Sequence, residues 1–289
     1  MKTRFLKGIF SLFVLSVFCI SCNNVAGNSE NEVEYDSIVV NQTYHLLNNP
    51  DNPNCDFHIS FTYPKSADAD LLKAMQQFFV GSYFGDTYEN VSPEEAVTQY
   101  TKEYIDAYKE LEVDFKEELK RSSKDSPVSA WFSYYETSSN EIKYNKYGLV
   151  CTSIYFENYT GGAHGSHSLT HHIFSMETAK RLTEEDIFVE DYQEPLSKII
   201  VSHLVKENKA ASAKELEDMG FFSVDEIFPN DNFLIDDTGI TYTFNEYEIA
   251  PYSAGRINVH IPFDELDTIL KKESPISKML KEVKQQSLE

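Results

Sequence analysis

Cysteine is scarce in this 289-residue sequence, which has four: Cys19 lies in an apolar segment near the start, and Cys22 comes just after that segment. The two others are Cys55 and Cys151, so the paired-cysteine motif of a structural zinc site is absent. Both lie on strand-like segments. In an oxidising compartment they can form one disulfide bridge, and the alternative is two separate buried thiols.

Positive charge is also scarce, because 25 Lys and Arg stand against 47 Asp and Glu, giving a net charge of −22. Such a surface repels nucleic acid and anionic lipid and attracts cationic partners. The acidity also serves solubility, so by itself it does not identify a partner. With 20 Phe and 18 Tyr, the chain has enough aromatic residues for a packed sheet or a binding surface. This content argues against a disordered protein.

Catalytic signatures are missing as well. The sequence has no serine nucleophile elbow, phosphate-binding glycine loop, dinucleotide fingerprint or helical zinc-protease motif. Carboxylate pairs carry no information here, because so many acidic residues make some pair inevitable. We therefore expect a protein that is not an enzyme and uses no cofactor.

Four histidines lie close together, at His164, His167, His171 and His172. On a strand, His167 and His171 would share a face, about 13 Å apart at roughly 3.3 Å per residue. That separation is too long for chelation of one metal ion. We expect exposed strand and turn histidines and no metal site.

The first residues have the pattern of an export signal. Three positive charges lie among the first seven residues, and the apolar segment Gly8–Ile20 is too short for a comfortable transmembrane helix. Ser21 and Cys22 follow, which resembles a bacterial lipoprotein signal. This predicts a signal peptide over 1–21, lipid modification at Cys22, a flexible tether over 22–34, and a cell-envelope location on the periplasmic or outer-membrane face. The alternative is an ordinary secreted protein.

Strand and helix patterns are interleaved along the rest of the chain. Cys55–Tyr63 alternates apolar and polar residues, which predicts a half-buried strand with His58 on the wet face. Ser92 and Pro93 predict a helix start. Strands over 128–137 and 142–158, joined by a turn at Ser138–Asn140, would continue the sheet. We expect an α+β fold with a mixed, mostly antiparallel sheet, helices on one side, and two intimate halves, 35–140 and 141–285.

The stretch Tyr159–Gly165, Tyr-Thr-Gly-Gly-Ala-His-Gly, follows a strongly apolar strand-like segment and precedes another strand. Its glycines supply the positive-φ positions of a sharp strand connection. They also leave bare backbone N–H groups beside His164. A simple hairpin turn explains the pattern equally well.

This stretch, with Arg181–Phe188 and Phe244–Gly255, resembles one family: the extracellular domain of RsiV-type anti-sigma factors, which is also the N-terminal module of PdaC-type peptidoglycan deacetylases. The motifs occur in the family's order, and with Ile261-Pro262-Phe263 they span roughly 150 to 270. No deacetylase domain follows them, and only about seven residues precede the apolar segment. The expectation is the extracytoplasmic module alone.

The resemblance implies a binding or sensing module of the cell envelope, with a basic, lysozyme-like muramidase as a candidate partner. The alternative is a cell-wall carbohydrate-binding protein or an envelope hydrolase in which His164 acts as acid, base or ligand contact. The residues expected to line the binding surface, if the two motif loops lie near each other, are Tyr159, Gly161, Gly162, His164, Tyr247, Glu248 and Tyr252. The same residues would also serve simply to hold the fold.

Overall fold

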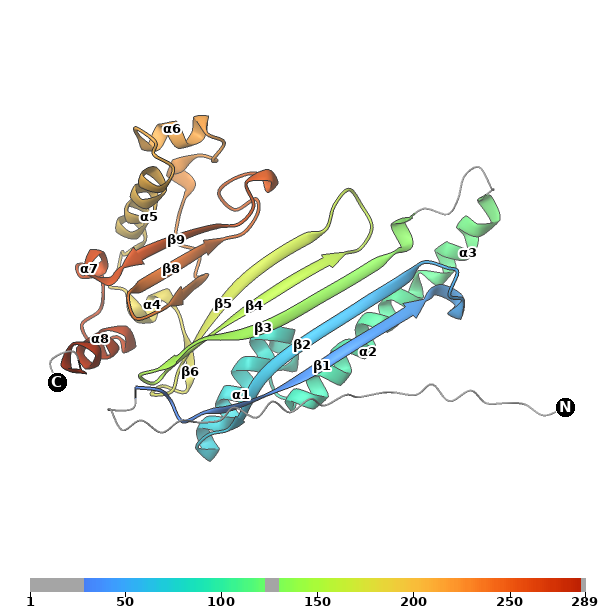
Figure 1. The fold of residues 1–289 in the computed structure, drawn as a ribbon, viewed down its shortest axis with the longest axis horizontal. Helices are drawn as coiled ribbons and strands as arrows, with labels where there is room; N and C mark the ends of the chain where they lie inside the picture. Colours follow the sequence, from blue (N-terminus) through green and yellow to red (C-terminus); the bar gives the residue numbers. More distant parts are fainter. Residues whose placement is uncertain (1–28, 123–129, 287–289) are drawn as a thin grey trace.

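The computed structural model describes residues 29–122 and 130–286, and its main feature is a long six-stranded sheet (Figure 1). The strand order is β1-β2-β3-β4-β5-β6, and every neighbouring pair is antiparallel except β2 and β3, which are parallel. The strands are β1 (Glu34–His45), β2 (Asn54–Ser66), β3 (Tyr134–Lys146), β4 (Leu149–Tyr159), β5 (Ser166–Ser175) and β6 (Lys180–Leu182). The predicted α+β fold with a mixed, mostly antiparallel sheet is confirmed.

Helices cover one face of this sheet, here called the helix face. They are α1 (Ala69–Phe84), α2 (Pro93–Glu110) and α3 (Glu112–Arg121), which lie behind the strands in Figure 1. The Ser92 hydroxyl accepts a hydrogen bond from the Glu95 N–H, so this predicted helix start is confirmed. The inward residues of β2 (Cys55, Phe57, Ile59, Phe61 and Tyr63) pack with aromatic residues of the helices in one apolar core.

The C-terminal residues form a smaller unit that covers one end of the opposite face, here called the outer face. Its sheet has the order β7-β8-β9, all antiparallel. The elements are α4 (Glu184–Ile187), α5 (Gln193–Glu207), α6 (Ala213–Asp218), β7 (Phe233–Ile235), β8 (Gly239–Phe244), β9 (Ile257–Pro262), α7 (Phe263–Leu266) and α8 (Pro275–Gln286). They share a second core with Tyr144, Cys151 and Ile173 of the large sheet. The boundary predicted at 140 falls inside β3, so the two halves share this sheet.

The turn predicted at Ser138–Asn140 is wrong, because these residues lie inside β3. The Asn140 side chain accepts from the Thr62 N–H (2.7 Å) and donates to the Thr62 carbonyl (2.8 Å), extending the β2–β3 connection past its last backbone pair. The actual turn is Tyr147-Gly148, with φ of 53° and 71°. Two positive values are typical of a two-residue hairpin turn.

The two cysteines of the domain do not form a bridge. Cys55 and Cys151 are both free and buried, and they belong to the two different cores on opposite faces of the sheet. Burial raises the pKa of both thiols to about 12, so neither is reactive in the folded protein. Of the two alternatives, the structure has the separate buried thiols.

Cys22 and the signal segment lie outside the described residues. Within residues 29–122 and 130–286, none of the helices combines the length and the apolar character that a membrane crossing requires.

Candidate functional site

Two of the motif segments are loops: the first motif loop is Tyr159–Gly165, and the second is Tyr247–Gly255 in the C-terminal unit. They are distant in the chain but meet on the outer face. The His164 ring stacks on Tyr252 with ring centroids 4.5 Å apart and planes inclined by 25°. Tyr252 also contacts His167 (5.8 Å) and Tyr247 (5.8 Å). We call His164, His167, Tyr247 and Tyr252 the aromatic patch. The expectation that the loops lie near each other is therefore confirmed.

The first loop connects β4 to β5, and its backbone requires glycine. Gly161 and Gly162 have φ of +83° and +128°, which side chains rarely adopt. A Cβ on Gly161 would also lie 2.8 Å from the Trp131 carbonyl oxygen. The Tyr159 hydroxyl donates to the Gly162 carbonyl at 2.9 Å and closes the turn. The conformation presents His164 on the surface.

The second loop follows β8 and is fixed by Asn245. Its Oδ1 accepts from the Leu169 N–H (2.8 Å) and its Nδ2 donates to the Leu169 carbonyl (3.2 Å), so the loop is joined to β5. Tyr247 has φ of 68°, and its N–H donates to the Ala250 carbonyl at 3.0 Å. This left-handed residue turns the chain, and the Tyr247 side chain remains 56% exposed.

Carboxylates surround the patch. Glu246 Oε1 lies 3.1 Å from His167 Nδ1. Glu157 accepts hydrogen bonds from the hydroxyls of Tyr155 (2.7 Å) and Tyr135 (2.8 Å), which hold the pKa of its carboxyl below the usual value. In turn, Glu157 raises the pKa of Tyr155 to about 12. The site therefore combines aromatic rings with carboxylates that are held by hydrogen bonds.

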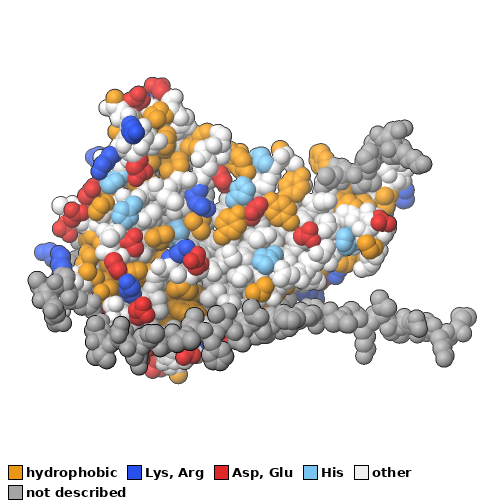
Figure 2. Space-filling model, in the orientation of Figure 1, with side chains coloured by type: hydrophobic (Ala, Val, Ile, Leu, Met, Phe, Trp, Pro, Cys, Tyr) orange, Lys and Arg blue, Asp and Glu red, His pale blue; other side chains and the backbone are white. Residues whose placement is uncertain are grey.

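More aromatic rings extend the same surface. Tyr135 stacks on Tyr159 with ring centroids 6.2 Å apart, and Trp131, in the short 3-10 helix Ala130–Phe132 before β3, is 69% exposed. Figure 2 shows histidine, hydrophobic and acidic side chains together over the ends of β4 and β5. Tyr135, His167 and Glu157 were not predicted as part of this surface, because only the strand register places them beside the loops.

The predicted surface residues divide into two groups by their contacts. His164, Tyr247 and Tyr252 present rings on the surface. Gly161, Gly162 and Tyr159 shape the turn. Glu248 joins this second group, since its carboxylate accepts from Asn230 Nδ2 (2.6 Å) and Asn245 Nδ2 (3.3 Å) and so braces the second loop.

The prediction that the clustered histidines are exposed is wrong for His171 and His172. His171 is 3% exposed, with Nδ1 2.7 Å from Ser153 Oγ and Nε2 2.9 Å from Thr243 Oγ1. Burial lowers its pKa to about 4, so the ring is neutral at physiological pH. It joins β5 to the C-terminal unit. Within the described residues, no group of three or more His, Cys, Asp and Glu could hold a metal ion.

The outer face beyond the patch is polar along β1 and β2. The hydroxyls of Ser37 and Thr62 lie 2.9 Å apart, and Thr43 donates to Asp56 at 2.7 Å. Asn41 and His58 are also hydrogen-bonded. Because the C-terminal unit covers only one end of the sheet, these side chains face outward, and Figure 2 shows a mostly uncharged expanse there.

The fold and this surface define a class: an α+β protein in which two sheets join and their loops gather aromatic rings. A solved structure from Bacteroides fragilis, described as a member of the DUF3298 family, matches with a TM-score of 0.81 and 33% identity, covering 86% of this chain and 97% of that one. This chain therefore belongs to the DUF3298 family.

Two further comparisons agree with that assignment. The family described as "Protein of unknown function (DUF3298)" matches residues 185–264, which include the second motif loop. A DUF3298 family protein from Pseudomonas aeruginosa shares the fold, with a TM-score of 0.57 at 14% identity over 84% of this chain and 97% of that one. Comparison with curated proteins gives no match.

Proposed function

We propose that the protein is an extracytoplasmic binding module that holds a partner protein against its aromatic patch. The observation that carries this proposal is the stacking of His164 from one loop on Tyr252 from the other, 4.5 Å between centroids, with Tyr247 exposed beside them. Tyrosine rings supply large contact area at low entropic cost, and they are enriched among the residues that dominate binding energy.

The partner that this surface fits best is a basic protein. The net charge of −22 gives long-range attraction, and Glu157 and Glu246 add negative charge next to the rings. The resemblance of the two loops to RsiV-type domains supports a lysozyme-like muramidase as that protein. The signal-like start of the chain, with Ser21 and Cys22 after the apolar segment, supports attachment to the envelope through a lipid on Cys22.

Calorimetric titration with a c-type lysozyme at low and at physiological salt tests the proposal. Charge attraction alone fades as the screening length shortens to about 8 Å near 0.15 M salt. Binding through the patch should persist there and should weaken at least tenfold in a Tyr247→Ala, Tyr252→Ala double variant. Val113→Ala, which truncates an exposed apolar side chain of α3 on the opposite, helix face, is the control.

No binding at physiological salt contradicts this function, and so does equal binding by a folded double variant. Attachment is tested separately: Cys22→Ala should move the protein from the membrane fraction to the soluble fraction. A wild-type protein that is already soluble would remove the lipid anchor from the proposal without affecting the patch.

A second candidate function is recognition of cell-wall glycan. The polar outer face favours it, because Asp56, which accepts a hydrogen bond from Thr43, is paired with Tyr135 of the stacked pair Tyr135–Tyr159. Polar side chains beside aromatic rings are what sugar hydroxyls and sugar faces bind. Co-sedimentation with purified cell wall, lost in Tyr135→Ala, supports this function. Release of soluble fragments would instead indicate a hydrolase.

A further inference from the structure

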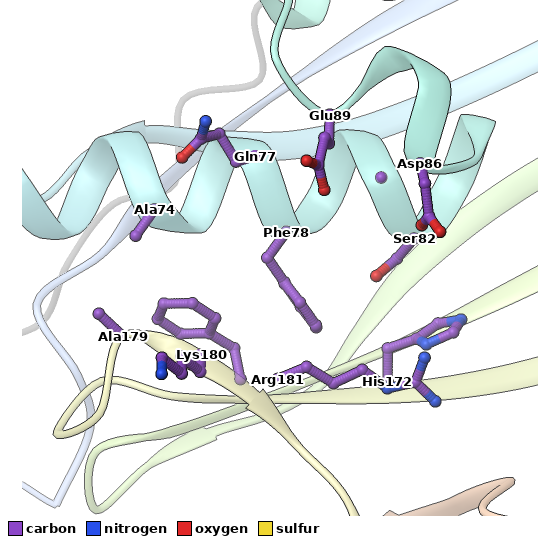
Figure 3. Close-up of a pocket in the computed structure, with 12 residues that line it drawn as sticks. Ala74, Gln77, Phe78, Ser82, Asp86, Glu89, His172, Ala179, Lys180 and Arg181 are labelled. Atoms are coloured by element: carbon purple, nitrogen blue, oxygen red, sulfur yellow. The ribbon is translucent and has the colours of Figure 1, made fainter.

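A cavity that is separate from the aromatic patch lies on the helix face, at the edge of the large sheet. It measures about 490 Å³ and lies between α1 with the following 3-10 helix η2 (Asp86–Tyr88) on one side and β5 with β6 on the other. Figure 3 shows the two walls facing each other across Phe78. Its size is in the range of sites that take small organic ligands, roughly 300 to 1,000 Å³.

His172, which lines the cavity, has a buried polar atom that lacks a partner. His172 Nδ1 is buried and makes no hydrogen bond with any residue in the described part of the chain. A buried polar nitrogen without a partner costs free energy, and such atoms in native proteins call for an explanation. Because burial lowers the pKa of His172 to about 3, the ring is neutral and offers one N–H and one lone pair.

The two walls carry opposite charges. Asp86 and Glu89 are exposed on the helix wall with Ser82, while Lys180 and Arg181 lie on the strand wall (Figure 3). Lys180 makes no ion pair with the residues that the structure describes. Arg181 uses Nη2 for Asp231 at 3.1 Å, but a guanidinium has five N–H donors.

The local sequence builds this arrangement. Gly81 on α1 has no side chain, and a Cβ there would lie 3.2 Å from the Glu89 Cβ, so the glycine lets Glu89 approach the helix. On the other wall, β6 pairs with β5 so that Arg181 is opposite Phe174. The floor is apolar, since Phe78 lies 5.2 Å from Phe174 and 6.4 Å from the His172 ring.

We propose that this cavity binds a short zwitterionic peptide. Its carboxylate would pair with Lys180 and Arg181, its ammonium group with Asp86 and Glu89, and an apolar side chain would rest on Phe78. A polar group of the peptide would bond to His172. A simple anion or a simple cation would satisfy only one wall, whereas a zwitterion satisfies both. The site does not depend on the function proposed for the aromatic patch.

Titration of the purified protein with alanyl-phenylalanine tests this proposal. The free dipeptide should bind, while its N-acetylated form and its C-terminal amide should each bind about tenfold more weakly, because each loses one charge-assisted contact. The Lys180→Gln variant should weaken the free dipeptide by a similar factor yet bind the amide as the wild type does. Glu89→Gln together with Asp86→Asn should show the same pattern with the acetylated form.

Lys73→Gln provides the matched control, because Lys73 is exposed on α1 and does not line the cavity. This variant should bind the dipeptide like the wild type. The proposal is overturned if the dipeptide gives no saturable signal at millimolar concentration. It is also overturned if blocking either end leaves binding unchanged, or if the wall variants bind all three compounds like the wild type.

Discussion

The two faces of the large sheet bury very different chemistry. The helix face is covered mainly by aromatic and aliphatic side chains, whereas the outer face has an apolar core beneath the C-terminal unit and mostly polar side chains on β1 and β2 beyond it. Strand β5 shows the contrast in two adjacent residues. His171 on the outer face has two hydroxyl partners, and His172 on the helix face has none for Nδ1. Both faces thus contribute a core, and only the outer face leaves a large part of the sheet uncovered.

The largest difference should appear when one apolar side chain is truncated on each face. Phe61 is fully buried on the helix face, against Tyr83 and Phe84, so Phe61→Ala should lower the free energy of unfolding by about 3 to 5 kcal/mol. Val39, on the outer face of β1, is 37% exposed, so Val39→Ala should cost about 0.5 kcal/mol. Urea denaturation measures both. Similar losses would contradict this contrast between the faces.

The helix face also contains a carboxyl that makes stability depend on pH. Glu136 is 3% exposed, and burial raises its pKa to about 7, although the Tyr100 hydroxyl donates to it at 2.9 Å. A raised folded-state pKa means that its contribution to stability is complete below pH 4.5 and is lost as the pH rises through 7. Between pH 5 and pH 8 this group should cost the wild type about 2 to 3 kcal/mol.

Comparison of the wild type with Glu136→Gln isolates this contribution. His171 and His172, whose pKa values are lowered, act in the opposite direction at acid pH in both proteins and cancel in the difference. The stability of the variant relative to the wild type should therefore increase from pH 5 to pH 8. A relative stability that does not change with pH would show that Glu136 titrates normally.

Alanine substitutions at Gly161 and Gly162 should separate the steric cost of a side chain in the β4–β5 turn from its conformational cost. Gly161→Ala meets both a positive φ and the Trp131 carbonyl, so it should lose more than the roughly 1 kcal/mol expected for Gly162→Ala, which has open space around it. Thermal unfolding of the two variants measures the difference. If Gly162→Ala is the more damaging, the close approach to Trp131 does not limit the turn.

The smallest effect on stability is expected at His164, an exposed ring. His164→Ala should change the free energy of unfolding by about 0.5 kcal/mol or less, while weakening binding of the partner at the patch. Calorimetry of unfolding and of binding on the same sample checks both. A loss as large as that of Gly161→Ala would mean that His164 holds the fold.

Local patterns predicted the elements with strong periodicity. The alternation of Cys55–Tyr63 identified β2, and the glycines of Tyr159–Gly165 identified the β4–β5 turn, because both signals are contained in a few adjacent residues. The turn predicted at Ser138–Asn140 failed for the opposite reason. The Asn140 amide is satisfied by Thr62, 78 residues away, and no local pattern records that partner.

Local patterns also failed to predict which distant residues come together in the aromatic patch and in the cavity on the helix face, unless a motif resemblance linked them. Motif resemblance brought His164 and Tyr252 together, since both belong to recognisable loops. Nothing in the sequence linked residues 74–89 to residues 172–181, although both segments line the cavity on the helix face. Burial of His171 and His172 was equally hidden, because it arises from covering units on both sides of β5.

The parallel contact between β2 and β3 has a consequence for the order in which the chain folds. Strands β3, β4 and β5 form a meander of near neighbours, whereas β2 reaches β3 only after α1, α2 and α3 have crossed over. Closing that long loop costs chain entropy before any contact is gained, so pairings of this kind form slowly. We expect the β1–β2 hairpin and the β3–β5 meander each to be protected from hydrogen exchange earlier in refolding than the parallel β2–β3 junction. The two parts of the large sheet would then form separately and join last.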